Sequence, residues 1–184
     1  KLEYSSSAAQ TLSGVISGGN AANTVLVKDT GTGSTLTVTG VNTFAGKISV
    51  SAGVLAINAD SSLGAAPGGV TATSLTLDGG TLEAMADITL DANRGITLGT
   101  SGGAVLVDAG KTLTYGGVMT GGALTKTGAG TLDLTGVNTY TGNTLIAAGT
   151  LQVGGAGSLG AGAYAGAIAL STTVRVTPLR MALS

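Results

Sequence analysis

Short runs of alternating apolar and polar residues dominate this sequence. In most of them every second residue is Leu, Val or Ile, and the residue between is commonly Thr. Alternation over four or five residues predicts a β-strand with one buried face. Such runs, or shorter apolar ones of strand length, occupy residues 25–27, 35–39, 54–57, 74–78, 88–90, 96–98, 105–107, 113–115, 131–135 and 150–153.

The segments between these runs are rich in glycine, which predicts turns. They include Gly-Gly, Gly-Thr-Gly, Ala-Gly and Asp-Gly-Gly, and the chain has 33 glycines among 184 residues. No stretch shows the 3.6-residue apolar period of a helix, and glycine is unfavourable within helices. The sequence therefore predicts an all-β fold, although this strand spacing also suits a sandwich or a barrel.

An internal repeat decides between these architectures. The structural repeat motif comprises Gly40, Asn42, Thr43, Phe44 and Gly46, and it recurs 96 residues later as Gly136, Asn138, Thr139, Tyr140 and Gly142. Similarity around the motif extends over residues near 14–69 and 117–166. A long repeat divided into coils of about 20–25 residues is typical of stacked solenoids, so a parallel β-helix is predicted.

The motif residues have a structural interpretation. Phe44 and Tyr140 occupy equivalent repeat positions, which favours packing in the core or at a corner over ligand stacking. Asn42 and Asn138 are expected to cap or ladder a corner of the helix. The motif is therefore a candidate for a role in architecture.

The amino-acid composition indicates what kind of core the chain has and which classes of partner it can bind. Hydrophobic residues make up 43% of the chain and aromatic residues only 3%, which indicates a thin core of small aliphatic side chains. A net charge of −1 provides no basic surface for nucleic acid. The chain has no cysteine, and no apolar run has the length of a membrane-spanning helix. We expect one β-solenoid domain over 1–184, with a C-terminal tail, 171–184, outside the repeat pattern.

Candidate catalytic chemistry is restricted to carboxylates, because the chain contains no histidine. Asp78, Glu83, Asp108 and Asp133 show no acid and base pair of the kind that cleaves polysaccharides. Asp87 and Asp91 share a face of the 88–90 strand, and the neighbouring Thr89 and Arg94 indicate a solvated outer surface. No enzyme activity, cofactor or metal site is predicted.

The second repeat copy also carries a family resemblance. Residues 124–144, which read LTKTGAGTLDLTGVNTYTGNT, and the following Ala148-Gly149-Thr150-Leu151 closely resemble the passenger-associated repeat of bacterial autotransporters. The resemblance implies a right-handed parallel β-helix on the surface of a Gram-negative cell. It also implies a passenger stalk that supports export, with the rest of a parent passenger and host or cell surfaces as partners.

A second hypothesis is a filament of stacked copies. The ends of a β-helix expose unpaired strand edges and apolar side chains, which invite head-to-tail association of the chain with itself. The candidate assembly ends are Leu2, Tyr4, Val174, Val176 and Leu179. A third hypothesis, a surface polysaccharide enzyme, lacks visible catalytic residues.

Overall fold

The computed structural model describes residues 1–171, which form three parallel β-sheets and two short 3-10 turns, η1 (Asp60–Leu63) and η2 (Gly160–Gly162). Sheet A contains, in order, β1 (Leu2–Tyr4), β3 (Thr24–Lys28), β5 (Lys47–Val50), β7 (Thr71–Leu77), β10 (Arg94–Leu98) and β13 (Met119–Gly121). Sheet B contains β2 (Gln10–Leu12), β4 (Thr35–Val38), β6 (Val54–Ile57), β8 (Thr81–Ala84), β11 (Gly103–Val107), β14 (Leu124–Thr127), β16 (Thr144–Ile146) and β18 (Ile168–Leu170). Sheet C contains β9 (Ile88–Leu90), β12 (Thr112–Tyr115), β15 (Thr131–Leu134) and β17 (Thr150–Val153).

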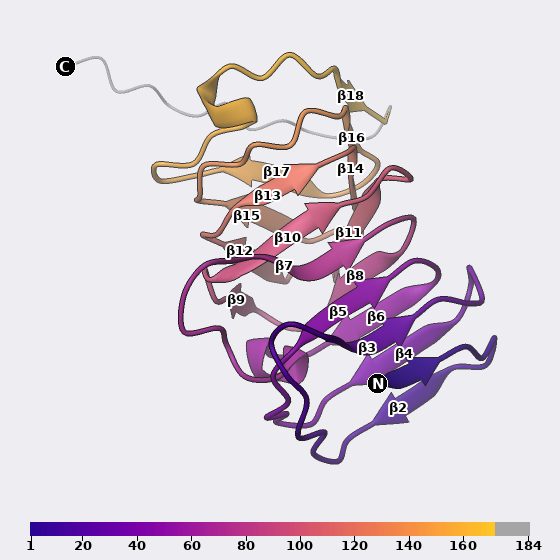
Figure 1. The fold of residues 1–184 in the computed structure, drawn as a ribbon. Helices are drawn as coiled ribbons and strands as arrows, with labels where there is room; N and C mark the ends of the chain where they lie inside the picture. Colours follow the sequence, from indigo (N-terminus) through magenta and orange to yellow (C-terminus); the bar gives the residue numbers. More distant parts are fainter. Residues whose placement is uncertain (172–184) are drawn as a thin grey trace.

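The sheets are the sides of a stacked solenoid (Figure 1). One coil is a single pass of the chain through side A, side B and side C, each side named after its sheet. Every strand pairs in parallel with the equivalent strand of the next coil, as Ile48 pairs with Leu75 and Leu55 with Leu82. The predicted all-β parallel β-helix is confirmed.

The interior consists of stacked aliphatic side chains. On side A, the register places Leu26, Ile48, Leu75, Ile96 and Met119 in one inward-facing column, and each is at most 2% exposed. The outward residue that follows this column is Ser49, Thr76, Thr97 or Thr120 in four of these strands and Val27 in β3. Each buried Leu or Ile contributes about 1.5–3 kcal/mol to stability. The two-residue period of the sequence therefore produces a narrow, dry core.

Side C is not a sheet along its whole length. Before β9, side C consists of residues 13–18, residues 41–45 and η1. Scattered backbone hydrogen bonds, and not a ladder of paired strands, join these segments. Thr43 N donates to Ile16 O at 3.0 Å, and Ala65 N donates to Phe44 O at 2.9 Å. Side A changes in the same way after β13, where Thr139 N donates to Met119 O at 2.8 Å. These irregular sides are where the repeat motif lies.

The two motif copies occupy different sides of the solenoid. The first copy follows β4 and lies on side C, whereas the second follows β15 and lies on side A. Strands of matching sequence also lie on different sides: β4 belongs to sheet B, and its counterpart β15 belongs to sheet C. The 96-residue offset therefore does not contain a whole number of coils.

All ten strands predicted from alternation or apolar runs are present, within a few residues of their expected ends. Sequence analysis missed β1, β2, β5, β8, β13, β14, β16 and β18, most of which are short. Within residues 1–171 no helix has the length and apolar character needed to cross a membrane. The predicted assembly residues Val174, Val176 and Leu179, and all but Ser171 of the predicted tail, lie outside the described residues.

Candidate functional site

The first repeat motif is centred on a buried asparagine. Asn42 is 3% exposed, and its side chain contacts the coils on both sides. Its Oδ1 accepts a hydrogen bond from Ile16 N at 2.7 Å, and its Nδ2 donates to Ser62 O at 2.8 Å. One amide side chain thus links three successive coils where side C has no strands.

The second motif repeats this arrangement on side A. Asn138 is fully buried, and its Oδ1 accepts from Met119 N at 2.9 Å. Its Nδ2 donates to Gly136 O at 2.8 Å and to Ser158 O at 3.3 Å. A buried backbone amide or carbonyl left without a partner costs about 1–3 kcal/mol, so each asparagine satisfies groups that no strand can reach.

The aromatic residues of the motif lie inside the solenoid. Phe44 and Tyr140 are both completely buried. The Tyr140 hydroxyl is 2.8 Å from Thr144 Oγ1, which is also 2.8 Å from the Tyr164 hydroxyl. Tyr164 also donates to Gly142 O at 2.5 Å. Burial raises the pKa of Tyr140 to about 12, so the Tyr140 hydroxyl is neutral at physiological pH.

The threonines and glycines of the motif have two environments. Thr43 and Thr139 are exposed, so they do not contribute to the core. Gly40 and Gly136 lie against the preceding coil, where an added Cβ would be 2.2 Å from the carbonyl oxygen of Gly14 or Gly117. Gly46 and Gly142 are half-buried, and a Cβ there would collide with Val25 or with the backbone near Ala123. The glycines therefore allow neighbouring coils to approach closely.

Two buried lysines are a further shared feature that sequence reasoning missed. Lys28 and Lys126 are both 0% exposed and point inward at matching places in the repeat. Lys126 Nζ donates to Thr127 O at 2.6 Å, to Gly128 O at 2.9 Å and to Ala148 O at 3.3 Å. Lys28 Nζ donates to Thr30 O and lies 5.6 Å from the centre of the Tyr4 ring.

The same glycine position makes room for each lysine. Gly53 and Gly149 have φ values of 67° and 69°, and a Cβ on either would lie 2.9 Å from the lysine Nζ. Burial lowers the pKa of Lys28 and lowers that of Lys126 to about 8. The signal was present in the sequence, because Lys28 is in phase with Leu26 and Lys126 with Leu124.

Several of the candidate acidic residues accept hydrogen bonds from backbone amides, whereas Asp133 Oδ1 is buried without a partner among the described residues. Asp87 Oδ1 accepts from Thr112 N, and Asp91 Oδ1 accepts from Asn93 N, both at 2.8 Å. The prediction that Arg94 lies on a solvated outer surface is wrong, because Arg94 is only 4% exposed. Its guanidinium instead pairs with Asp60, with Nε 2.8 Å from Oδ1. Sequence reasoning missed Asp60, which is 31 residues or more from its partners.

The Glu83 carboxyl is influenced by the neighbouring Asp108. Burial of Glu83 and the negative charge of Asp108 raise the pKa of the Glu83 carboxyl. Within residues 1–171 no group of three or more acidic side chains could hold a metal ion. The pair alone does not define a binding or catalytic site.

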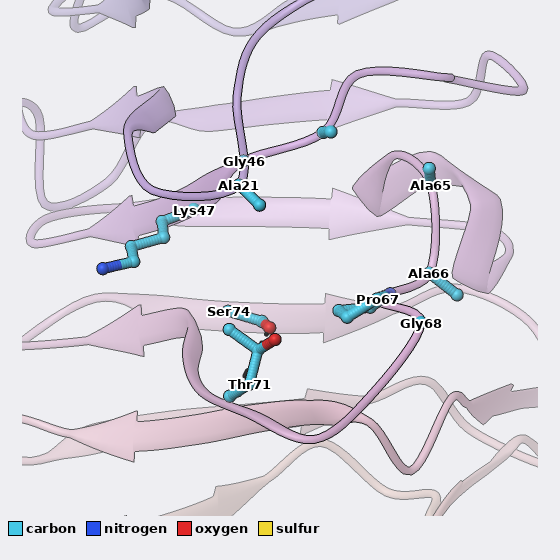
Figure 2. A pocket seen from close by; sticks show the side chains of 10 residues that line it. Ala21, Gly46, Lys47, Ala65, Ala66, Pro67, Gly68, Thr71 and Ser74 are labelled. Carbon is cyan, nitrogen blue, oxygen red and sulfur yellow. Dashed lines mark hydrogen bonds between the residues drawn. The ribbon is translucent and has the colours of Figure 1, made fainter.

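Two small cavities formed by the described residues lie beside the two motif copies. A cavity of about 180 Å³ lies beside the first motif and is lined by Ala21, Ala45, Gly46, Lys47, Ala65, Ala66, Pro67, Gly68, Thr71 and Ser74. Figure 2 shows the Lys47 ammonium pointing away from the alanines and Pro67. A cavity of about 140 Å³ lies beside the second motif and includes Tyr140, Ala161 and Tyr164. Ligand pockets usually exceed about 300 Å³, so neither cavity suits a sizeable ligand.

Comparison with known proteins agrees with this architecture. Residues 29–57 and 124–153 match the family model described as Passenger-associated-transport-repeat. Residues of this chain are also 41% identical over 87 positions to a protein named Adhesin BmaC autotransporter from Brucella suis biovar 1 (strain 1330). That alignment covers 47% of this chain and 2% of the adhesin. No solved structure matches the chain.

The fold and these matches define a class. The chain is a parallel β-solenoid with two segments that match the passenger-associated transport repeat, and the predicted resemblance is confirmed. The matches indicate a location outside the cell, on the surface of a Gram-negative bacterium. Both matched segments end with a strand of the solenoid, β6 or β17, and each includes the motif asparagine.

Proposed function

We propose that this chain is a rigid, non-catalytic stalk segment of a surface-displayed passenger, and that its stacking coils support export. One observation carries the proposal. The asparagines that make the motif recognisable are buried and bond one coil to the next, and its aromatic rings are buried in the core, so the motif serves architecture and presents no ligand site. Folding of each added coil outside the cell supplies free energy that opposes its return.

The export role can be tested in a Gram-negative cell that displays the chain. A double variant with Asn42→Ala and Asn138→Ala should show less surface display, measured as the amount of chain that is cleaved by protease added to intact cells. The matched control is Val41→Thr with Val137→Thr, which alters exposed positions of the same motif (67% and 48% exposed). Equal surface display of the asparagine and valine pairs would contradict the export role.

The stalk role predicts a shape. Small-angle scattering of the purified chain should report an elongated monomer whose dimensions do not depend on concentration. A compact particle, or a soluble chain with hydrolytic activity toward polysaccharides that is lost on Asp87→Asn or Asp91→Asn, would contradict it. The bonds of these two carboxylates to backbone amides support the structural assignment.

Exposed inward-facing residues favour a second candidate, the stacking of copies into filaments. Leu2 in β1 is 37% exposed, and Ile168 and Leu170 in β18 are 53% and 46% exposed. The register places all three on the core side of their strands. Negative-stain microscopy over a range of concentrations tests this candidate. Filaments that disappear in Leu2→Asp and Ile168→Asp variants would support it, and short rods at every concentration would reject it.

A further inference from the structure

Side C changes from irregular segments to a sheet between η1 and β9, and this transition is called the break. β9 is the first strand of sheet C and pairs only with β12. The preceding coil places the 3-10 turn η1 at this position, so no parallel ladder joins the two coils there. Sheets A and B continue across the break through the pairs β5–β7 and β6–β8. Backbone carbonyls at the end of η1 therefore require other donors.

The Arg94 side chain supplies those donors. Its Nη1 donates to Leu63 O at 3.0 Å, and its Nη2 donates to Gly64 O at 2.6 Å. The same guanidinium holds the Asp60 carboxylate through both oxygens, with Nη2 3.1 Å from Oδ2 and Nε 2.8 Å from Oδ1. Asp60 Oδ1 also accepts from Asp91 N at 3.1 Å. This planar fork of donors suits a carboxylate and two carbonyls in a way that an ammonium group cannot.

Further buried groups extend the connection in both directions. The Tyr115 hydroxyl donates to Arg94 O at 2.6 Å and lies 3.1 Å from Val118 O. Met119, which follows Val118, is bonded through its N–H to Asn138. On the other side, Asn42 donates to Ser62 O within η1. Polar side chains, together with the backbone groups to which they bond, thus connect the first motif copy to the second.

We propose that Arg94 is a latch that couples the coils before β7 to the coils after it. In a solenoid each coil contacts only its neighbours, so a weak interface lets one part open while the rest stays folded. Side C offers only non-strand contacts at the break, and the bonds of Arg94 replace the missing ladder. With Arg94 in place, the coils before β7 and the coils after it unfold together. Removal of Arg94 leaves Asp60 with only the Asp91 N–H as donor and leaves the buried carbonyls of Leu63 and Gly64 without these donors, which is costly.

Amide hydrogen exchange of the purified chain tests the latch. Arg94→Met should accelerate exchange in residues 42–65 by roughly 100-fold, while amides in residues 124–134 keep their protection. Lys111→Met is the matched control, since Lys111 is half-buried and has no side-chain hydrogen bond within the described residues, and it should alter neither region. Equal acceleration in both regions, or no acceleration in either, would overturn the proposal.

A second variant covers the case in which Arg94→Met does not fold. Asp60→Asn removes the charge pair but keeps the donors of Arg94 to Leu63 O and Gly64 O, so the chain retains part of the latch. It should accelerate exchange in residues 42–65 by roughly 10-fold and leave residues 124–134 unchanged. A uniform change along the chain would again reject the latch.

Discussion

The two repeat copies share a sequence pattern but occupy different sides of the solenoid. The first motif spans side C, where it is followed by β5 of sheet A, and the second spans side A, where it is followed by β16 of sheet B. Each asparagine nevertheless bonds to the coils before and after it. The comparison teaches that the motif defines a local connection between coils and not an orientation around the axis.

The two copies differ together at three matching positions. Phe44, Ile48 and Gly68 in the first copy correspond to Tyr140, Thr144 and Tyr164 in the second. Three positions that are apolar or lack a side chain in one copy carry hydrogen-bonded hydroxyls in the other. Because a buried hydroxyl requires a partner, these changes are expected to be compatible only together.

Loss of the second asparagine should have the largest effect on stability. Asn138→Ala leaves the buried Met119 N–H without a partner, and we expect a loss of about 3 kcal/mol in urea denaturation. Asn42→Ala should cost about 2 kcal/mol, because Ile16 is only half-buried. The exposed Asn143→Ala serves as the control, with a smaller loss. A larger effect at Asn42 than at Asn138 would contradict the comparison.

A pH titration should distinguish the lysines of the two copies. Burial lowers the pKa of Lys126 to about 8, so above this pH the unfolded chain binds a proton that the folded chain has released. Stability should therefore rise by about 1.5 kcal/mol from pH 8 to 9.5. Above about pH 10 the raised pKa values of Tyr115 and Tyr140 oppose the rise, because the unfolded chain ionises its tyrosines first.

The lysine variants give the control for this titration. Lys126→Met should abolish most of the rise between pH 8 and 9.5, whereas Lys28→Met should abolish less, because the charge of Asp29 opposes the lowering of the Lys28 pKa. Thermal or urea denaturation at each pH measures the difference. An unchanged slope in Lys126→Met would show that this lysine does not lose its proton in the folded chain.

Exchange of the aromatic residues between copies should have a moderate effect. Tyr140→Phe removes one hydroxyl from a bonded cluster and should cost about 1 kcal/mol. Phe44→Tyr places a hydroxyl beside Ile48 without a hydroxyl partner and should cost about 1–3 kcal/mol. A double-mutant cycle of Tyr140→Phe with Thr144→Val measures the coupling. Strictly additive losses would mean that the hydroxyl cluster is not a unit.

The exposed valines of the motif should have the smallest effect. Val41→Thr and Val137→Thr change side chains that are 67% and 48% exposed, and each should alter the free energy of unfolding by less than about 0.5 kcal/mol. Urea denaturation of both variants is sufficient. A loss of more than about 1 kcal/mol would reveal a contact made by these valines.

Alternation and the internal repeat were sufficient to predict the parallel solenoid, because a two-residue period records which side chains face a core. The sequence could not indicate that the copies lie on different sides, since this depends on the number of coils between them. Arg94 was misplaced because its partners, Asp60 and the carbonyls of Leu63 and Gly64, are distant in sequence. The inward phase of Lys28 and Lys126 was readable, but lysine is rarely buried, so neither was assigned to the core.

Engineered disulfides test the placement of the second copy most directly, because the chain has no cysteine of its own. The register pairs Ala104 in β11 with Thr125 in β14, both on the outer face of side B, at a spacing that a disulfide can span. Ala104→Cys with Thr125→Cys should therefore crosslink on mild oxidation. If the second copy occupied the same sides as the first, β14 would lie on side A, away from β11, and Ala104→Cys with Thr125→Cys would not crosslink. That result would contradict the account.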